Sequence, residues 1–229
     1  EFINQTLKDL HEADVANLIE NLNPDTRVKL IELESFNIDP EIFVELNESI
    51  QSEVLKLLSI ESVIRIIKRL ESDDAIKILE NLERDKKDKI LEKLPPKDKF
   101  LLEEGLSYPE DSAARIMQRE FTAVPSNWTV GQTIDYLRET KDLPEEFLEI
   151  FIVDNDFKPI GTVPSSRVLR TPRELKMSSI MTEMPVHISV EMDQEEVGYI
   201  FENYNLVSAG VVNKDNKLVG MITADDVVT

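Results

Sequence analysis

The chain has 229 residues, of which 41% are hydrophobic and 31% charged, so it can bury a core and is not disordered. It has no cysteine, which excludes disulfides, thiolate metal sites and a cysteine nucleophile. Its 26 basic and 46 acidic side chains give a net charge of -20, which disfavours nucleic acid as a partner because phosphates would be repelled. The excess of acidic over basic residues is the same in both halves of the chain. Residues 1–104 hold 15 basic and 25 acidic residues, and residues 105–229 hold 11 basic and 21 acidic residues.

Residues 1–106 are predicted to be helical, because they hold one glycine and almost no alternation of polar and apolar residues. Leucines recur every twelve residues from Leu10 to Leu106, with one exception at Glu34, and short polar breaks follow most of them. The breaks contain Asn, Ser, Pro and Asp, which are typical of helix starts. The pattern predicts an all-α superhelix of short helices that bury their apolar faces on one another.

The rest of the chain holds one unit twice. "FTAVPSNWTVGQTIDYLRET" and "PVHISVEMDQEEVGYIFENY" both run from a strand into a helix, with Thr129 and Asp193 as matching caps. "KPIG" then matches "KLVG", so each copy is expected to form β-α-β-β-α, and the two copies are expected to pair with a cleft between them. "DNDFKPIG" lacks the glycine and glutamate of a calcium loop and is predicted to be a hairpin turn.

The duplicated unit resembles the CBS domain, whose characteristic glycine would be Gly161 and Gly220. The segment "SYPEDSAARIM", between a helical region and a CBS pair, resembles the cytosolic part of the MgtE family of magnesium transporters, although Ala114 stands where that family usually has glycine. The resemblance covers essentially the whole chain. We therefore predict a helical superhelix over 1–106, a join helix over 107–120, a first CBS domain over 121–175 and a second over 176–229, an α+β tandem pair.

The resemblance also implies partners and a location. It implies a homodimer formed through the CBS domains, and a transmembrane magnesium pore of the same protein that would follow Thr229. Because the chain opens on Glu1 rather than methionine, we expect it to be part of a longer protein. The expected location is cytoplasmic, at the cytosolic face of the plasma membrane in the full-length protein.

Several carboxylates are candidate magnesium ligands. Mg²⁺ prefers oxygen ligands and usually contacts one or two carboxylates while it keeps several waters. The predicted ligands are Glu41, Asp73, Asp74, Asp193, Glu195, Asp225 and Asp226. The resemblance places the ion between the helical domain and the second CBS domain, and a further family aspartate is Asn205 here. Taken singly, each carboxylate is better explained as a solvated helix start, so the metal hypothesis depends on the set.

An adenine nucleotide such as ATP is a second candidate ligand. CBS domains that bind adenine nucleotides often carry Gly-x-x-[Ser/Thr]-x-x-Asp, and the second copy keeps it with Thr223 and Asp226. The first copy has Pro164 and Arg167 at these places, so at most one such site per chain is expected.

The sequence favours a magnesium-sensing regulatory domain that gates a membrane magnesium transporter or channel, with Mg²⁺ bridging acidic surfaces of the helical and CBS domains. The alternative is an adenine-nucleotide-sensing CBS module in which metal is incidental, and a third hypothesis is a helical scaffold that docks a partner. An enzyme is not expected, because His11 and His187 are the only histidines and no phosphate loop or metalloprotease motif is present.

Overall fold

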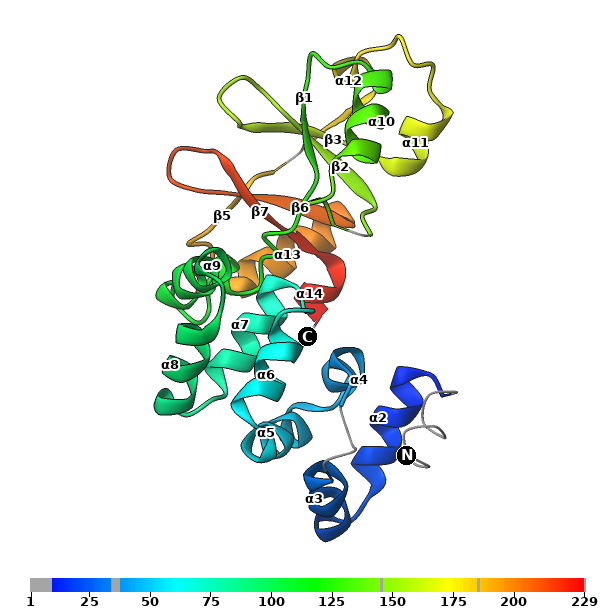
Figure 1. The fold of residues 1–229 in the computed structure, drawn as a ribbon. Helices are drawn as coiled ribbons and strands as arrows, with labels where there is room; N and C mark the ends of the chain where they lie inside the picture. The colour runs from blue at the N-terminus through cyan, green and yellow to red at the C-terminus, as the bar shows by residue number, and fades with distance from the viewer. Residues whose placement is uncertain (1–9, 34–37, 145, 185, 229) are drawn as a thin grey trace. The chain divides into compact units, whose positions relative to one another are not determined.

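The computed structural model describes residues 10–33, 38–144, 146–184 and 186–228 (Figure 1). The chain divides into two compact units after Glu104, and each is described by itself. None of the described helices combines the length and the apolar character that a membrane span requires.

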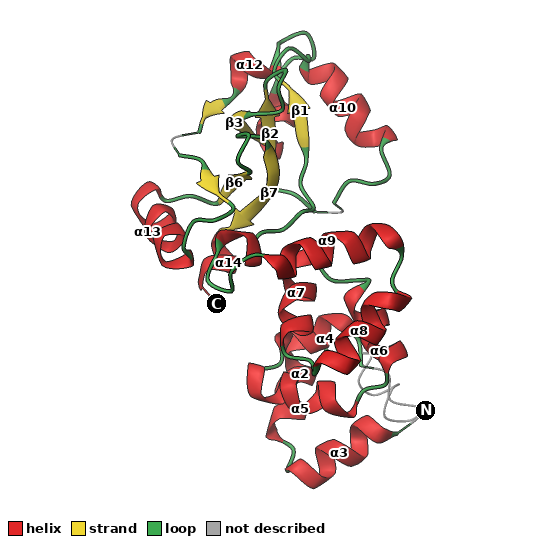
Figure 2. Ribbon diagram, turned by 90° about the vertical axis from the view of Figure 1, so that its left-hand side faces the viewer, coloured by secondary structure: helices red, strands yellow, loops and turns green. Residues whose placement is uncertain are grey.

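The first unit is built from short α-helices, and its described residues form no strand (Figure 2). The helices are α2 (Glu12–Asn21), α3 (Pro24–Glu32), α4 (Pro40–Glu45), α5 (Glu48–Leu57), α6 (Ile60–Ile67), α7 (Ser72–Glu80), α8 (Arg84–Lys93) and α9 (Pro96–Ser107). Helix α2 packs on α4, α3 on α5, α4 on α6, and α6 on α8, so contacts skip one helix each time. This arrangement confirms the predicted superhelix.

The polar breaks begin the helices as the sequence predicts. Asn23, Asn47 and Ser59 each accept a hydrogen bond from the backbone N–H three residues later, which caps α3, α5 and α6. The leucines of the twelve-residue pattern lie at the other ends, where several are C-caps: Leu22, Leu46, Leu58 and Leu94. The leucines that recur every twelve residues therefore lie at helix C-termini, and the polar residues that follow them begin the next helix.

One lysine ties two helices of the superhelix together. The Nζ of Lys86, in α8, donates to the carbonyl oxygens of Leu55 and Leu58 at 2.6 and 2.7 Å, at the end of α5. These carbonyls lack partners within their own helix, and a positive charge suits this end of the helix dipole. Burial lowers the pKa of Lys86, and the nearby charge of Glu83 opposes that shift.

Replacing Lys86 with methionine is expected to lower the free energy of unfolding of the first unit by about 1–2 kcal/mol, because two carbonyls lose a charged donor. Helical circular dichroism during urea unfolding measures the change. Lys89→Met is the control, because Lys89 is an exposed lysine on the same helix. An equal effect of both substitutions would contradict the role given to Lys86.

The second unit contains a four-stranded and a three-stranded sheet, in which β1–β3 and β5–β7 share one topology. The strands are β1 (Ala123–Pro125), β2 (Glu149–Val153), β3 (Pro159–Pro164), β4 (Thr182–Glu183), β5 (Ile188–Ser189), β6 (Ser208–Val212) and β7 (Leu218–Thr223). In the first sheet β1 runs parallel to β2, which is antiparallel to β3; in the second, β5 runs parallel to β6, which is antiparallel to β7. The predicted duplication and the α+β fold class are confirmed.

Helices lie beside both sheets. They are α10 (Val130–Glu139), α11 (Ser165–Arg170), α12 (Met177–Ile180), α13 (Gln194–Tyr204) and α14 (Ala224–Val228). Figure 1 shows α10 to α12 near β1–β3, and α13 and α14 near β6 and β7. Thr129 and Asp193 cap α10 and α13, as the matched copies predict. The segment "DNDFKPIG" forms the predicted hairpin turn, in which the side chain of Asp154 accepts two backbone hydrogen bonds.

The predicted join helix over 107–120 is wrong. Helix α9 ends at Ser107, and the only helical turn that follows is the three-residue 3₁₀ helix η1 (Ala113–Arg115). The backbone N–H groups of Ala113 and Ala114 instead donate to the carbonyls of Met192 and Val190, at 2.7 and 3.1 Å. The segment does not continue helix α9, because its polar backbone groups pair with the second copy. The domain boundaries assigned from the sequence remain predictions.

The two copies exchange their leading segments. Gln118, which precedes the first copy, pairs with Met221 in β7, whereas β4, which precedes the second copy, pairs with β3. The exchange requires two glycines. A Cβ on Gly220 would lie 2.8 Å from the carbonyl oxygen of Gln118, and one on Gly161 would lie 2.7 Å from that of Thr182. The characteristic glycine of each copy is therefore where an incoming segment crosses the strand.

Candidate metal and nucleotide sites

Two carboxylates gather around one threonine at the start of α14. The Oδ2 of Asp226 accepts hydrogen bonds from the backbone N–H of Thr223 at 2.7 Å and from its hydroxyl at 2.8 Å. The Oδ1 of Asp225 lies 2.7 Å from the same hydroxyl. A hydroxyl has one hydrogen and can serve one of these acceptors at a time. The cluster therefore places two carboxylates around one hydroxyl, a concentration of negative charge that favours a proton or a cation.

A glutamine from the exchanged segment completes the surroundings of Asp226. The side-chain amide of Gln118 donates to Oδ1 and Oδ2 of Asp226, each at 3.2 Å. Burial raises the pKa of Asp226, and the charge of Asp225 adds to the rise, while the hydrogen bonds from Thr223 and Gln118 oppose it. A carboxylate whose ionised form is disfavoured in this way would gain from a nearby positive charge.

Asp193 and Glu195 lie together at the start of α13, in the same unit. The carboxylate of Asp193 accepts a hydrogen bond from the backbone N–H of Glu195 at 2.8 Å, and both side chains are exposed. The segment before the first copy holds this end of the helix, because Gln194 donates through its backbone to the carbonyl of Asp111 at 2.8 Å. Asn205 ends the same helix in a left-handed conformation, with a φ of 47°, which asparagine tolerates well.

The remaining predicted ligands belong to the first unit. Asp73 and Asp74 lie in the first turn of α7, and both are partly exposed. Glu41 lies in the first turn of α4, with an oxygen 3.7 Å from the guanidinium of Arg69. Exposed ion pairs at this distance are weak, so Arg69 would compete little with a divalent cation.

The described part of the chain contains no group of three or more histidine, cysteine, aspartate or glutamate side chains placed to hold a metal ion. The arrangement at α14 nevertheless suits Mg²⁺, which needs one or two carboxylates and keeps its waters for the remaining positions. The two carboxylates that approach the one hydroxyl of Thr223 are the observation on which this fit depends. Asp225 and Asp226 would supply oxygen ligands there, and Thr223 would hold their orientation.

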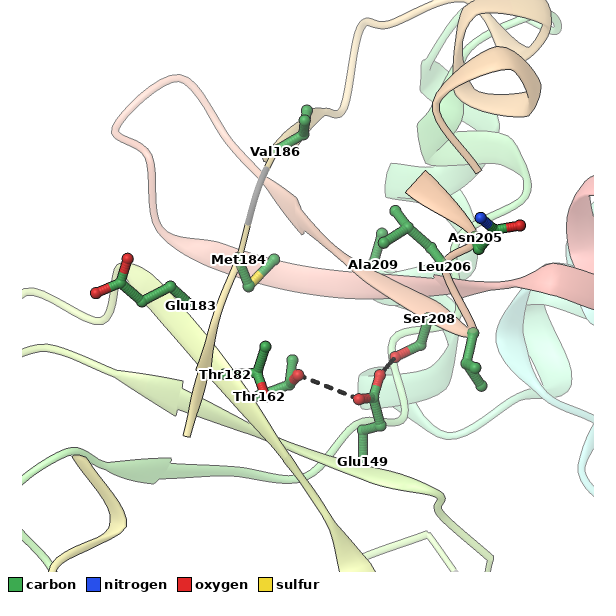
Figure 3. A pocket seen from close by; sticks show the side chains of 11 residues that line it. Glu149, Thr162, Thr182, Glu183, Met184, Val186, Asn205, Leu206, Ser208 and Ala209 are labelled. Atoms are coloured by element: carbon green, nitrogen blue, oxygen red, sulfur yellow. Dashed lines mark hydrogen bonds between the residues drawn. The ribbon is translucent and has the colours of Figure 1, made fainter. Parts of the chain in front are cut away.

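The second candidate site is a cavity of about 190 Å³ between the two copies (Figure 3). Its walls come from β2, β3, β4 and the start of β6. The lining residues are Glu149, Thr162, Thr182, Glu183, Met184, Val186, Asn205, Leu206, Val207, Ser208 and Ala209. The carboxylate of Glu149 accepts from the hydroxyl of Ser208 at 2.5 Å and from that of Thr162 at 3.1 Å. One acid of the first copy thereby connects both copies at the cavity.

Neither residue of the predicted nucleotide motif lines this cavity. Thr223 and Asp226 are hydrogen-bonded to each other, and Asp226 also to Gln118. The corresponding residue of the first copy, Arg167, donates to the hydroxyl of Thr182 at 3.1 Å, and Thr182 does line the cavity. The described cavity is thus adjacent to the copy that lacks the motif.

Sequence reasoning missed two residues of these sites, Gln118 and Glu149. The alignment of the copies contained a signal for the first, because Gln118 precedes the first copy where Thr182 precedes the second. Glu149 had no such signal, since a glutamate that opens a strand is usually an exposed residue. Only the pairing of the two sheets brings Ser208 to it.

The chain matches two family models, the MgtE intracellular N domain over residues 10–111 and the CBS domain over 113–174 and 177–229. The magnesium transporter MgtE of Thermus thermophilus is 28% identical over 133 residues, which are 58% of this chain and 30% of that protein. The magnesium transporter MgtE of Bacillus subtilis is 26% identical over 123 residues, 54% of this chain and 27% of that protein. The matched parts of the chain thus cover less than a third of the length of these relatives.

A solved structure extends the likeness to the whole fold. A crystal structure of the cytosolic domain of the Mg²⁺ channel MgtE in complex with ATP matches with a TM-score of 0.86 and 25% identity. The match covers 98% of this chain and 92% of that one, so the order of a helical region and a CBS pair is common to both.

Proposed function

The chain belongs to the MgtE family, of which it carries the intracellular N domain followed by a CBS pair, and we propose that it is the cytosolic magnesium-sensing part of a magnesium transporter. The observation that carries this proposal is the pair of carboxylates, Asp225 and Asp226, that share the hydroxyl of Thr223. Such a pair is stabilised by a divalent cation, and the family's transporters carry one as cargo.

The sensing mechanism follows from charge. The two units carry nearly equal negative charge, so they repel each other when divalent cations are scarce. At high concentration Mg²⁺ would bridge carboxylates of the first unit, Asp73, Asp74 and Glu41, to those of the second. A ligand shifts such an equilibrium only through its different affinity for the two states. The bridged, compact state would hold the pore shut, and the repelled state would release it.

The proposal includes the surroundings of this domain. It would lie at the cytosolic face of the plasma membrane, be followed by a transmembrane pore, and pair with a second copy through the CBS domains. Its role would be regulatory rather than enzymatic. The solved neighbour named as the cytosolic domain of a Mg²⁺ channel supports this assignment.

Titration calorimetry with MgCl₂ tests the proposal. We expect Asp226→Asn and Asp73→Asn each to weaken Mg²⁺ binding. The double variant should weaken it by less than the sum of the two free-energy changes, because in the proposed bridged state both side chains would bind one ion. Asp88→Asn, an exposed aspartate in α8, is the matched control. Additive effects, or unchanged affinity in both single variants, would return Asp73 and Asp226 to the role of helix-start residues.

The cavity at Glu149 supports a second candidate function, the binding of an adenine nucleotide. A carboxylate beside two hydroxyls suits the hydroxyl groups of a ribose. The cavity is smaller than the roughly 300–1,000 Å³ of most ligand sites, so it would hold one part of the nucleotide. The neighbour that was crystallised with ATP agrees with this class of ligand.

Calorimetry with ATP in the presence of EDTA would locate the nucleotide. We expect Glu149→Ala to weaken ATP binding by about tenfold, as loss of one charged hydrogen-bond acceptor does. Asp226→Ala should leave ATP binding unchanged if the nucleotide lies in the cavity. Loss of binding in Asp226→Ala alone would instead place it at the motif that the sequence indicates.

A further inference from the structure

Gln118 is attached to the second copy at both its backbone and its side chain. Its backbone N–H donates to the carbonyl of Met221 at 2.8 Å, and its carbonyl accepts from the N–H of Met221 at 2.9 Å. The residue is only 4% exposed. The backbone of Gln118 is therefore held in place, and its side-chain amide donates to the carboxylate of Asp226.

The donors around Asp226 are divided unequally between its two oxygens. Oδ2 accepts from the backbone N–H and the hydroxyl of Thr223 and from the amide of Gln118, whereas Oδ1 accepts from the amide of Gln118. A carboxylate oxygen has two lone pairs, so Oδ1 keeps one for a further partner. Thr223 and Gln118 together fix the plane of the carboxylate and determine in which direction that lone pair points.

The first copy contains the same contact with the charge reversed. Arg167 occupies the place of Asp226, Thr182 the place of Gln118, and the guanidinium of Arg167 donates to the Thr182 hydroxyl at 3.1 Å. In both copies, therefore, the residue six positions after the characteristic glycine, Arg167 or Asp226, is hydrogen-bonded to the incoming segment. Only the second copy presents a carboxylate, so only there does the contact orient a cation ligand.

We infer that Gln118 is a positioning residue for Mg²⁺, which acts by holding Oδ1 of Asp226 in the direction of the ion. The inference rests on the proposed function, in which Asp226 binds Mg²⁺. Groups that orient a metal ligand through hydrogen bonds typically contribute 10- to 100-fold to metal affinity. Because Gln118 lies on the segment that leads out of α9, the orientation of Asp226 depends on how this segment is seated on β7.

Titration of the 229-residue chain with MgCl₂ tests the inference. Gln118→Met keeps the length and volume of the side chain but removes the donor, and we expect it to weaken Mg²⁺ binding 10- to 100-fold. Gln132→Met is the matched control, because Gln132 also accepts and donates within this unit, in the capping box of α10, and does not contact Asp226. Its Mg²⁺ affinity should equal that of the unchanged chain.

A second measurement separates positioning from mere structural support. The side-chain amide of Gln118 should shift in the ¹⁵N spectrum when MgCl₂ is added, and Asp226→Asn should abolish the shift. If Asp226→Asn weakens Mg²⁺ binding and Gln118→Met does not, the positioning role is overturned and the proposed function stands. If neither substitution changes Mg²⁺ binding, the proposed function fails as well. Weakening by Gln132→Met equal to that by Gln118→Met would attribute both effects to lost stability and overturn the role of Gln118.

Discussion

Gly220→Ala is expected to lower the free energy of unfolding of the second unit by about 3 kcal/mol, the upper part of the range for overpacked positions. A methyl group there would lie 2.7 Å from the sulfur of Met117 and 2.8 Å from the carbonyl oxygen of Gln118. The methionine can move aside, but the backbone carbonyl is held by its hydrogen bond with Met221. The exchanged segment would have to leave the strand. Fluorescence of Trp128, the only tryptophan, reports unfolding of this unit.

Gly198→Ala is the matched control for this prediction. Gly198 lies within α13, and a methyl group there would meet only the side chain of Val227, at an ordinary distance of 3.4 Å. Because alanine is the better helix former, this variant should gain up to about 1 kcal/mol. The same alanine would thus stabilise one position and strongly destabilise the other. A loss of stability at Gly198 equal to that at Gly220 would contradict the role of the crossing segment.

The sequence contained enough information for the two architectures. Helix starts at Asn23 and Asn47 and the matching caps Thr129 and Asp193 are local signals, because a capping side chain bonds a backbone group only two or three residues away. The duplication was equally visible, since both copies keep the turn and the glycine that follows it. These features are decided by neighbours in the sequence.

The join and the site surroundings depend on neighbours that are distant in the sequence. Residues 107–120 are predicted to be a helix, yet backbone pairing with the second copy leaves them as turns, isolated bridges and one 3₁₀ helix. Gln118 and Asp226 are 108 residues apart, and Glu149 and Ser208 are 59 apart. No periodicity or cap signal links such pairs. The candidate carboxylates could therefore be listed from the sequence, but not the residues that orient them.

In the absence of divalent cations, the contribution of Asp226 to stability should fall as the pH rises, which is the opposite of the usual behaviour of an aspartate. Its pKa is raised above the ordinary 3.8, with burial as the main cause. Between the unfolded and folded pKa values the folded chain binds more protons than the unfolded chain, so stability from this group falls as pH rises. Asp226→Asn has no such ionisation. The stability of the unchanged chain relative to this variant should therefore decrease as the pH rises from the ordinary pKa of an aspartate to the raised pKa of Asp226.

Magnesium should reverse that dependence, because the ion binds the ionised carboxylate and a proton competes with it. Acidification below the raised pKa of Asp226 should weaken Mg²⁺ binding by up to about tenfold per pH unit, starting at a higher pH than for an ordinary aspartate. Calorimetry at a series of pH values measures this, with Asp226→Asn as the comparison. The Mg²⁺ affinity of the variant should depend less steeply on pH, because the variant lacks the protonation of Asp226. An equal pH dependence of Mg²⁺ affinity in both proteins would mean that the ion does not bind Asp226. In the unchanged chain, stability without Mg²⁺ should fall as the pH rises, whereas affinity for Mg²⁺ should rise. Loss of both dependences in the variant would assign them to this one carboxylate.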